Sequence, residues 1–383
     1  MKRFIDCVQL MYRERFDVII ERIISKQNIC ALFSLEPISN SMKFILELRK
    51  KSFNINTLIT INSSDIISSS DIRIVDFKNF DTIKPLPSVI FVKDDVEYKI
   101  AFSQLDKGIE IINLGKNLQR SRDAYKSYME HISDLYDVYN LFIDEESKKA
   151  FCGYLLAKVS SKLSYAVHAN TPQYVCAGFA PKKDDILIDG GSCDGSTAAR
   201  FSDMGCKVFA FEMDKINYAM AAELAKKKGF VVENLGLGSY NHDSHYTHIE
   251  GNIGASKIAK DGNNITSIVT LDLYVANNKI PRVDFIKLDT EGAELNILRG
   301  ATDTIARYKP RLAISAYHKL NDLWVLTKFV KSIRPDYEFA FRHYAAANED
   351  GPFFVTREIQ DLFSEFDLDT KLPTFCDCVL LCR

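Results

Sequence analysis

Short apolar runs alternate with amphipathic segments along the first 120 residues. Residues 29–35, 55–62 and 88–94 are rich in aliphatic and aromatic side chains, which favours buried β-strands. Between the first two runs, residues 39–51 carry apolar side chains every three or four positions, which is the spacing of a helix. This strand–helix–strand order predicts a small Rossmann-like α/β domain over residues 1–120.

The middle of the chain has a helical pattern. Residues 121–142 and 145–166 both place apolar side chains at spacings of three and four. We therefore predict a helical bridge over residues 121–178, between the front domain and the remainder of the chain.

From residue 179 onward, strand-like apolar runs recur, most of them separated by helical text. The eight runs are residues 185–189, 207–212, 230–237, 265–272, 284–289, 311–317, 337–344 and 376–383. Helices between strands imply right-handed crossovers, so residues 179–383 are predicted to form a mostly parallel, doubly wound sheet. Ligands of such sheets bind at the carboxyl ends of the strands.

Composition narrows the classes of function. The 49 basic and 51 acidic residues nearly cancel, which disfavours nucleic acid or an anionic membrane as a partner of the whole molecule. No run approaches the roughly 20 apolar residues of a membrane span, and charges interrupt the N-terminal segment too often for a signal peptide. The nine cysteines are an odd, scattered set, as expected of reduced thiols in a cytoplasmic protein.

The front domain lacks the usual sign of a nucleotide site. Its first strand is followed by the turn at residues 34–41, which contains no glycine that would let a phosphate approach the backbone. We therefore expect this domain to be non-catalytic, as a scaffold or a docking surface for a partner.

The first strand of the rear part ends in an acidic, glycine-rich bend. Asp189 follows the apolar residues 186–188, Gly190 and Gly191 permit a sharp turn, and Asp194 and Gly195 precede the next helix. A dinucleotide fingerprint would place its glycines to receive a pyrophosphate. Two carboxylates at the bend instead suit a cationic ligand such as S-adenosylmethionine.

Two further residues fit the same ligand. Glu212 ends the second strand, where a carboxylate accepts hydrogen bonds from both ribose hydroxyls. Leu235 lies in a small-residue stretch after the third strand and could contact the adenine. Because nicotinamide-dependent enzymes share the acid at the position of Glu212, only the bend argues against an oxidoreductase.

Acidic and imidazole groups gather at two later strand ends. Asp289 ends one strand, Glu291 and Glu294 follow in the first turn of the next helix, and His318 ends the strand after it. Methyl transfer to a hydroxyl requires positioning and removal of one proton. We predict His318 as the general base, with Asp289 and Glu291 orienting the acceptor, and interpret Glu294 as a helix-capping residue.

Other polar groups are assigned no role in the chemistry. Arg342 and His343 are interpreted as a solvated strand end. The histidines at 242, 245 and 248 are expected in a loop, and the cysteines at 376, 378 and 382 in an apolar strand, so neither set offers metal-ligand spacing. We predict no metal site.

Three motifs together resemble the FkbM-type methyltransferases. They occupy residues 186–197, 283–301 and 312–324, within a similarity covering about residues 147–344. The resemblance implies a seven-stranded methyltransferase sheet of order 3-2-1-4-5-7-6 with an antiparallel last strand, use of S-adenosylmethionine, and transfer to oxygen. Met213 stands where the family often has proline, and the insertion between residues 344 and 376 is longer than the resemblance leads us to expect.

The sequence thus predicts an O-methyltransferase that acts on a hydroxyl of a sugar, glycan or related precursor, the acceptor class being implied by the resemblance alone. A methyltransferase of nucleic-acid amino groups would need an Asn/Asp-Pro-Pro-aromatic motif after the fourth strand, where this chain has residues 289–292, Asp-Thr-Glu-Gly. A non-catalytic cofactor-binding scaffold and a nicotinamide-dependent oxidoreductase remain as alternatives. The insertion after Tyr344 is a possible lid of the acceptor pocket.

Overall fold

The computed structural model describes residues 3–61, 71–105, 108–114, 117–249, 256–345, 364, 368 and 377–383. The chain divides into two compact units. The first contains Met1–Glu130 and Cys152–Val167, and the second contains His131–Phe151 and most of the chain from His168 onward.

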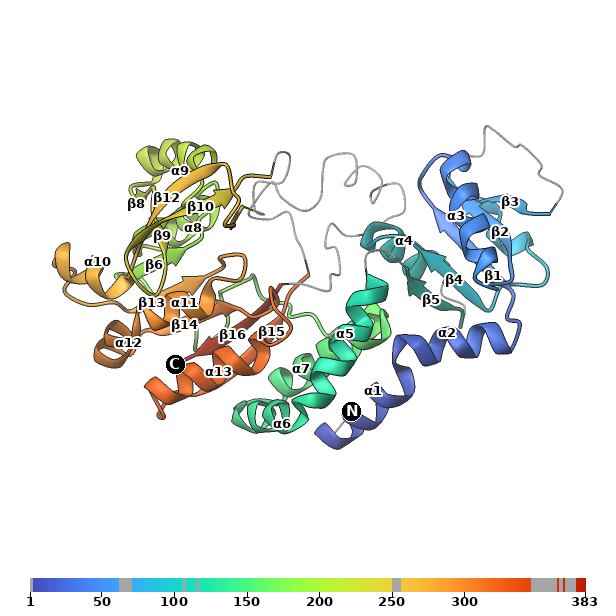
Figure 1. The fold of residues 1–383 in the computed structure, drawn as a ribbon, viewed down its shortest axis with the longest axis horizontal. Helices are drawn as coiled ribbons and strands as arrows, with labels where there is room; N and C mark the ends of the chain where they lie inside the picture. Colours follow the sequence, from blue (N-terminus) through green and yellow to red (C-terminus); the bar gives the residue numbers. More distant parts are fainter. Residues whose placement is uncertain are drawn as a thin grey trace. The chain divides into compact units, whose positions relative to one another are not determined.

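A five-stranded parallel sheet forms the centre of the first unit (Figure 1). Its order is β3-β2-β1-β4-β5, so β1 lies in the middle. All five residues of β1 are buried, because helices cover the sheet. The strands are β1 (Cys30–Ser34), β2 (Ile55–Thr60), β3 (Arg73–Asp76), β4 (Val89–Val92) and β5 (Glu110–Asn113).

Helices of the first unit bury their apolar faces on this sheet. Ile45 of α3 packs into one core with Leu32, Leu58 and Phe91 of the strands. Two helices before β1 were not predicted individually. The helical elements are α1 (Phe4–Glu14), α2 (Phe16–Ser25), α3 (Ile38–Lys50), the 3-10 helix η1 (Phe77–Thr82), α4 (Asp95–Leu105) and α5 (Asn117–Glu130).

The predicted helical bridge is divided between the units. It consists of α5, α6 (Ile132–Leu141), α7 (Glu145–Ser160) and a short 3-10 helix η2 (Leu163–Tyr165). The first residues of α7 belong to the second unit and the remainder to the first. Residues 166–178 contain no helix, so the helical prediction was too long at its end.

A seven-stranded mixed sheet forms the centre of the second unit, in the order β15-β16-β14-β13-β6-β7-β8. This is the order that the resemblance implied. The last strand along the chain runs antiparallel between β14 and β15, and the other pairs are parallel. The strands are β6 (Ile186–Gly190), β7 (Lys207–Phe211), β8 (Val231–Glu233), β13 (Phe285–Leu288), β14 (Arg311–Ser315), β15 (Phe339–His343) and β16 (Cys378–Cys382).

A second, four-stranded sheet corrects one prediction. Residues 265–272 were expected among the strands of the main sheet, but most of them form β12 of a separate sheet with the order β11-β10-β12-β9. Its alternating burial, with one polar face exposed, explains why it lies outside the fully buried main sheet. The strands are β9 (Gly236–Leu237), β10 (His242–Thr247), β11 (Lys257–Ile258) and β12 (Asn264–Val269).

Helices connect the parallel strands of the second unit. Phe201 of α8 is fully buried against strand residues such as Leu187, Val208 and Phe285. No helix in the described ranges is long and apolar enough to cross a membrane. The insertion after Tyr344, residues 345–375, lies almost entirely outside the described residues. The helices are α8 (Ser196–Asp203), α9 (Lys215–Lys228), α10 (Leu271–Asn277), α11 (Glu294–Arg299), α12 (Thr302–Tyr308) and α13 (Asp322–Ile333).

Candidate active site

The bend after β6 depends on glycine. Gly191 has a φ of 76°, in the left-handed region, and a Cβ built on it would overlap the backbone carbonyl oxygen of Asp289. Gly195, with a φ of 85°, precedes the first residue of α8. Asp194 accepts a hydrogen bond of 3.1 Å from the backbone N–H of Ser196, so it caps the start of that helix.

Asp189 does not face open space. Its side chain is fully buried and lies 2.9 Å from Nζ of Lys287, a buried residue of β13. Lys287 also donates a 2.7 Å hydrogen bond to the carbonyl oxygen of Gly191. Burial raises the pKa of Asp189, whereas Lys287 acts to lower it. The ion pair therefore fixes the bend. It also offsets the negative charge of Asp189 that was predicted to attract a cationic ligand.

Lys287 is a site residue that the sequence analysis missed. It lies inside an apolar run, and a buried lysine requires a partner of opposite charge. A single lysine in such a run was therefore the signal from which its role could have been predicted. Its Nζ also lies 5.7 Å from the ring centre of Tyr174. The sequence did not show that Asp189 is its partner, because β6 and β13 are neighbours in the sheet but lie far apart along the chain.

A cavity of about 600 Å³ opens beside the bend. Gly191, Glu212 and Leu235, three of the predicted cofactor-binding residues, line it. Asp189, Gly190, Asp194 and Gly195 are not among the lining residues. Asp289 and Glu291 line the same cavity, which places the predicted cofactor and acceptor groups together.

Glu212 presents a buried carboxylate to this cavity. It accepts hydrogen bonds of 2.8 Å from the backbone N–H groups of Cys193 and Asp214. Burial raises the pKa of Glu212 to about 7, although those two hydrogen bonds oppose the shift. A carboxylate has more acceptor positions than these two bonds use, so Glu212 can still accept hydrogen bonds from ligand hydroxyls.

Asp289 follows β13 directly and is held by two phenols. Tyr174 donates a 2.8 Å hydrogen bond to its Oδ2, and Tyr317 donates a 3.3 Å hydrogen bond to its Oδ1. Tyr174 comes from the segment before β6, and Tyr317 follows β14. These contacts fix the orientation of the carboxylate at the carboxyl edge of the sheet.

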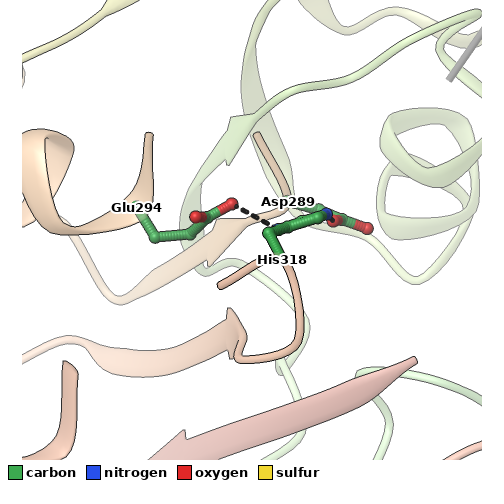
Figure 2. A group of neighbouring side chains, drawn as sticks. All are labelled: Asp289, Glu294 and His318. Atoms are coloured by element: carbon green, nitrogen blue, oxygen red, sulfur yellow. Dashed lines mark ion pairs between the residues drawn. The ribbon is translucent and has the colours of Figure 1, made fainter. Parts of the chain in front are cut away.

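His318 lies between carboxylates (Figure 2). Its Nδ1 is 3.0 Å from Oε1 of Glu294, and its Nε2 is 3.5 Å from one carboxylate oxygen each of Asp289 and Glu291. Burial alone would lower the pKa of this imidazole, but the surrounding carboxylates raise it to about 11. His318 therefore holds its proton at neutral pH. A protonated imidazole cannot accept a proton, which disfavours the predicted role of His318 as the general base.

Glu294 does more than cap a helix. Its fully buried carboxylate accepts hydrogen bonds from the backbone N–H and hydroxyl of Thr290, at 2.8 and 3.0 Å, and also pairs with His318. Burial opposes its ionisation, but His318 and these hydrogen bonds leave its pKa lowered. Glu291 was expected in the first turn of α11, but it precedes the helix in a loop, with a φ of 52°.

Arg342 and His343 were wrongly interpreted as solvated. Both are buried at the end of β15. Arg342 pairs with Asp144 at 3.2 Å and Glu146 at 3.1 Å, because the helical segment before β6 supplies carboxylates to this strand end. The ring of His343 lies 4.4 Å from that of His168.

The three histidines expected in a loop lie in or beside strand β10. His248 pairs with Asp214 at 2.7 Å, and the Nδ1 atoms of His242 and His245 lie within hydrogen-bond distance of backbone carbonyl oxygens. Cys378 and Cys382 are buried in β16, as small apolar residues would be, whereas Cys376 lies outside the described residues.

Comparison with known proteins relates part of the chain to one family. Residues 189–341 match the family model described as the methyltransferase FkbM domain. This part of the chain is similar to FkbM methyltransferase domains. It extends from the end of β6 into β15 and contains Glu212, Asp289, Glu294 and His318.

The chain is also similar to a methyltransferase from an archaeal source and to solved structures. Over 128 residues, the chain is 30% identical to the hexuronic acid methyltransferase AglP of Haloferax volcanii. That match covers 32% of this chain and about half, 53%, of AglP. The fold is similar to a methyltransferase FkbM from Methylobacillus flagellatus KT, with a TM-score of 0.64 and 17% identity over 99% of this chain and 98% of that one.

Proposed function

We propose that the protein transfers the methyl group of S-adenosylmethionine to a hydroxyl of a sugar-like acceptor. The observation that carries the proposal is the cavity of the part similar to FkbM methyltransferase domains, in which the buried carboxylate of Glu212 and the acidic pair Asp289 and Glu291 line one space.

The residues of this cavity fit the cofactor. Glu212 can accept hydrogen bonds from the ribose hydroxyls, Gly191 allows the ligand to lie against bare backbone, and Leu235 provides an apolar contact for the adenine. When bound, S-adenosylmethionine supplies an electrophilic methyl group. Asp189 takes part through its ion pair with Lys287, as a residue that holds the bend in place.

The acceptor end is formed by Asp289, Glu291 and His318. A carboxylate fixed by Tyr174 and Tyr317 can accept a hydrogen bond from an acceptor hydroxyl and orient it. Because His318 already holds a proton beside these carboxylates, a carboxylate oxygen of Asp289 or Glu291 accepts the proton of the hydroxyl as the methyl group moves from sulfur to oxygen. The similarity to AglP, a hexuronic acid methyltransferase, supports a sugar or uronic acid as the acceptor.

Cofactor binding is the first test. S-adenosylhomocysteine should raise the melting temperature of the full chain, whereas NAD should not. Glu212→Gln should weaken the binding of S-adenosylhomocysteine by about tenfold or more, because hydrogen bonds to a charged acceptor contribute roughly 1.5–3 kcal/mol. Glu223→Gln, at an exposed position of α9, is the matched control and should bind normally. Stabilisation by NAD and not by S-adenosylhomocysteine would favour the oxidoreductase alternative.

Turnover is the second test. Transfer of labelled methyl from S-adenosylmethionine should be followed on free hexuronic acids, nucleotide-linked sugars and a neutral hexose. His318→Ala should keep binding S-adenosylhomocysteine and lose transfer. Binding of the cofactor with no transfer to any hydroxylated acceptor would favour a non-catalytic module over an enzyme.

A further inference from the structure

Three carboxylates face one imidazole at the edge of the cavity. Ligand atoms of Asp289, Glu294 and His318 lie within 4.8 Å of one another, and Glu291 approaches the same ring. Even with a protonated imidazole, three carboxylates leave an excess of two negative charges in a half-buried place. Such an excess is stabilised by a further cation.

The two nitrogens of His318 have different surroundings. Nδ1 faces Glu294, whose side chain is 1% exposed, at 3.0 Å. Nε2 points away from Glu294, toward Asp289 (Figure 2). It also lies 3.5 Å from Oε1 of Glu291. A histidine that binds a metal through one nitrogen almost always donates the other N–H to a carboxylate, which fixes its tautomer and orientation. Glu294 has the position and burial of that second carboxylate.

The distances at Nε2 suit an ion better than direct hydrogen bonds. Both carboxylate oxygens lie 3.5 Å from Nε2, at the outer limit of a hydrogen bond. Neighbouring ligand atoms of an ion with bonds of 2.0–2.2 Å are roughly 3.0–3.5 Å apart. Tyr174 holds Asp289 from the opposite oxygen, as expected for an oriented metal ligand.

We propose that His318, Asp289 and Glu291 form a divalent-cation site, with Nε2 and two carboxylate oxygens as ligands and Glu294 as the residue that orients the imidazole. Glu294 faces Nδ1, whereas the two other carboxylates face Nε2, so an ion at Nε2 would take Asp289 and Glu291 as its carboxylate ligands. One imidazole nitrogen and two carboxylate oxygens suit a divalent first-row ion such as Mn²⁺.

The role of the ion rests on the proposed function. Three protein ligands leave open coordination positions, and the site adjoins the cavity that Asp289 and Glu291 line. Two adjacent oxygens of the acceptor, as in a vicinal diol or a hydroxy acid, would fill those positions and be held beside the methyl donor. A pair of oxygen donors would thus be preferred to an isolated hydroxyl.

The test is a titration of the full chain with Mn²⁺ after treatment with EDTA, followed by electron paramagnetic resonance. We expect about one bound Mn²⁺ per chain, and spin-echo modulation should show coupling to a nitrogen of His318. His318→Gln and Asp289→Asn should each weaken binding at least tenfold. Glu294→Gln should weaken it by about 10–100-fold, the usual effect of losing an orienting carboxylate. His245→Gln, in β10, is the matched control and should bind Mn²⁺ as the unmodified protein does.

Two results would overturn the proposal. The first is the absence of stoichiometric Mn²⁺ binding, and the second is bound Mn²⁺ without nitrogen coupling. Both are measured on the unmodified protein, so neither depends on how a variant folds. S-adenosylhomocysteine binding is measured on the same preparation. Cofactor binding without Mn²⁺ binding defeats the metal site alone, whereas Mn²⁺ binding without cofactor binding defeats the proposed function alone.

Discussion

The main sheets of the two units arrange five parallel strands in the same order but differ at the place where a ligand would bind. In the first unit β1 lies between β2 and β4, and in the second β6 lies between β7 and β13. Each arrangement creates a crevice at the carboxyl end of the central strand, where chain connections diverge to either side. The same crevice is closed in one unit and open in the other.

In the first unit, a side chain of the protein occupies the crevice. Glu97 of α4 is buried and accepts hydrogen bonds from the hydroxyl of Ser34 and the backbone N–H groups of Leu35 and Lys93, at 3.0, 2.9 and 2.7 Å. Its carboxylate therefore uses the backbone donors that an anionic ligand would need. A non-catalytic role for the front unit stays a prediction.

In the second unit, the corresponding turn contains Gly191, and the nearby carboxylate of Glu212 lines a cavity. Glu212 accepts hydrogen bonds from the backbone N–H groups of Cys193 and Asp214 and can accept further ones from a ligand. The comparison teaches that topology provides the crevice, whereas a glycine turn and an available carboxylate make it a site.

The largest effect is expected from closing the open crevice. Gly191→Ala places a Cβ against the carbonyl oxygen of Asp289 at a backbone φ of 76°, and the combined strain should exceed about 3 kcal/mol. Affinity for S-adenosylhomocysteine, measured by calorimetry, should fall by about 100-fold or more. Gly229→Ala is the control, because its φ is 79° but nothing lies within 4 Å of the added Cβ. It should cost only about 1 kcal/mol of stability. Normal affinity in Gly191→Ala would show that the bend does not contact the ligand.

The pH dependence of binding should distinguish the carboxylate of Glu212 from that of Glu97. Burial raises the pKa of Glu212 to about 7, and hydrogen bonds from ribose hydroxyls favour its ionised form. Binding of S-adenosylhomocysteine should therefore be strong above pH 7 and weaken by up to tenfold per unit as the pH falls below it. Glu212→Gln should remove this dependence, and Glu97→Gln should leave it unchanged. A profile that stays flat in the unmodified protein would contradict the ribose role.

The smallest effect on the ligand is expected from opening the closed crevice. Glu97→Ala removes the acceptor of three donors and should lower the free energy of unfolding of the first unit by about 1–3 kcal/mol for each donor left unpaired in the interior. Hydrogen exchange should become faster at the backbone N–H groups of Leu35 and Lys93. Affinity for S-adenosylhomocysteine should not change, and a decrease would show that the front unit takes part in cofactor binding.

Sequence patterns predicted the main sheet well because its strands are apolar runs that end in an acid. Asp189 and Glu212 could be placed at strand ends for this reason, and the bend required its glycines. The second sheet was partly missed because β10 is polar and rich in histidine, a composition typical of loops. Tyr246 is its one buried residue.

Partners from distant strands could not be predicted. Two pairs are examples, Lys287 with Asp189 and His318 with Glu294. Each pair depends on the order of the strands in the sheet and on the direction in which each side chain points. Arg342 was assigned to solvent because its partner Asp144 lies 198 residues away in the chain. A charged residue is predicted to be exposed when its partner of opposite charge cannot be identified from the sequence.

The position of β16 has a consequence for synthesis. This strand follows all the others of its sheet along the chain, yet it pairs with β14 on one side and β15 on the other. Until Cys378–Cys382 leave the ribosome, the nascent chain carries two unsatisfied strand edges, and its sheet is interrupted at that point. The main sheet of the second unit is therefore completed only after the last of its strands along the chain has been synthesised.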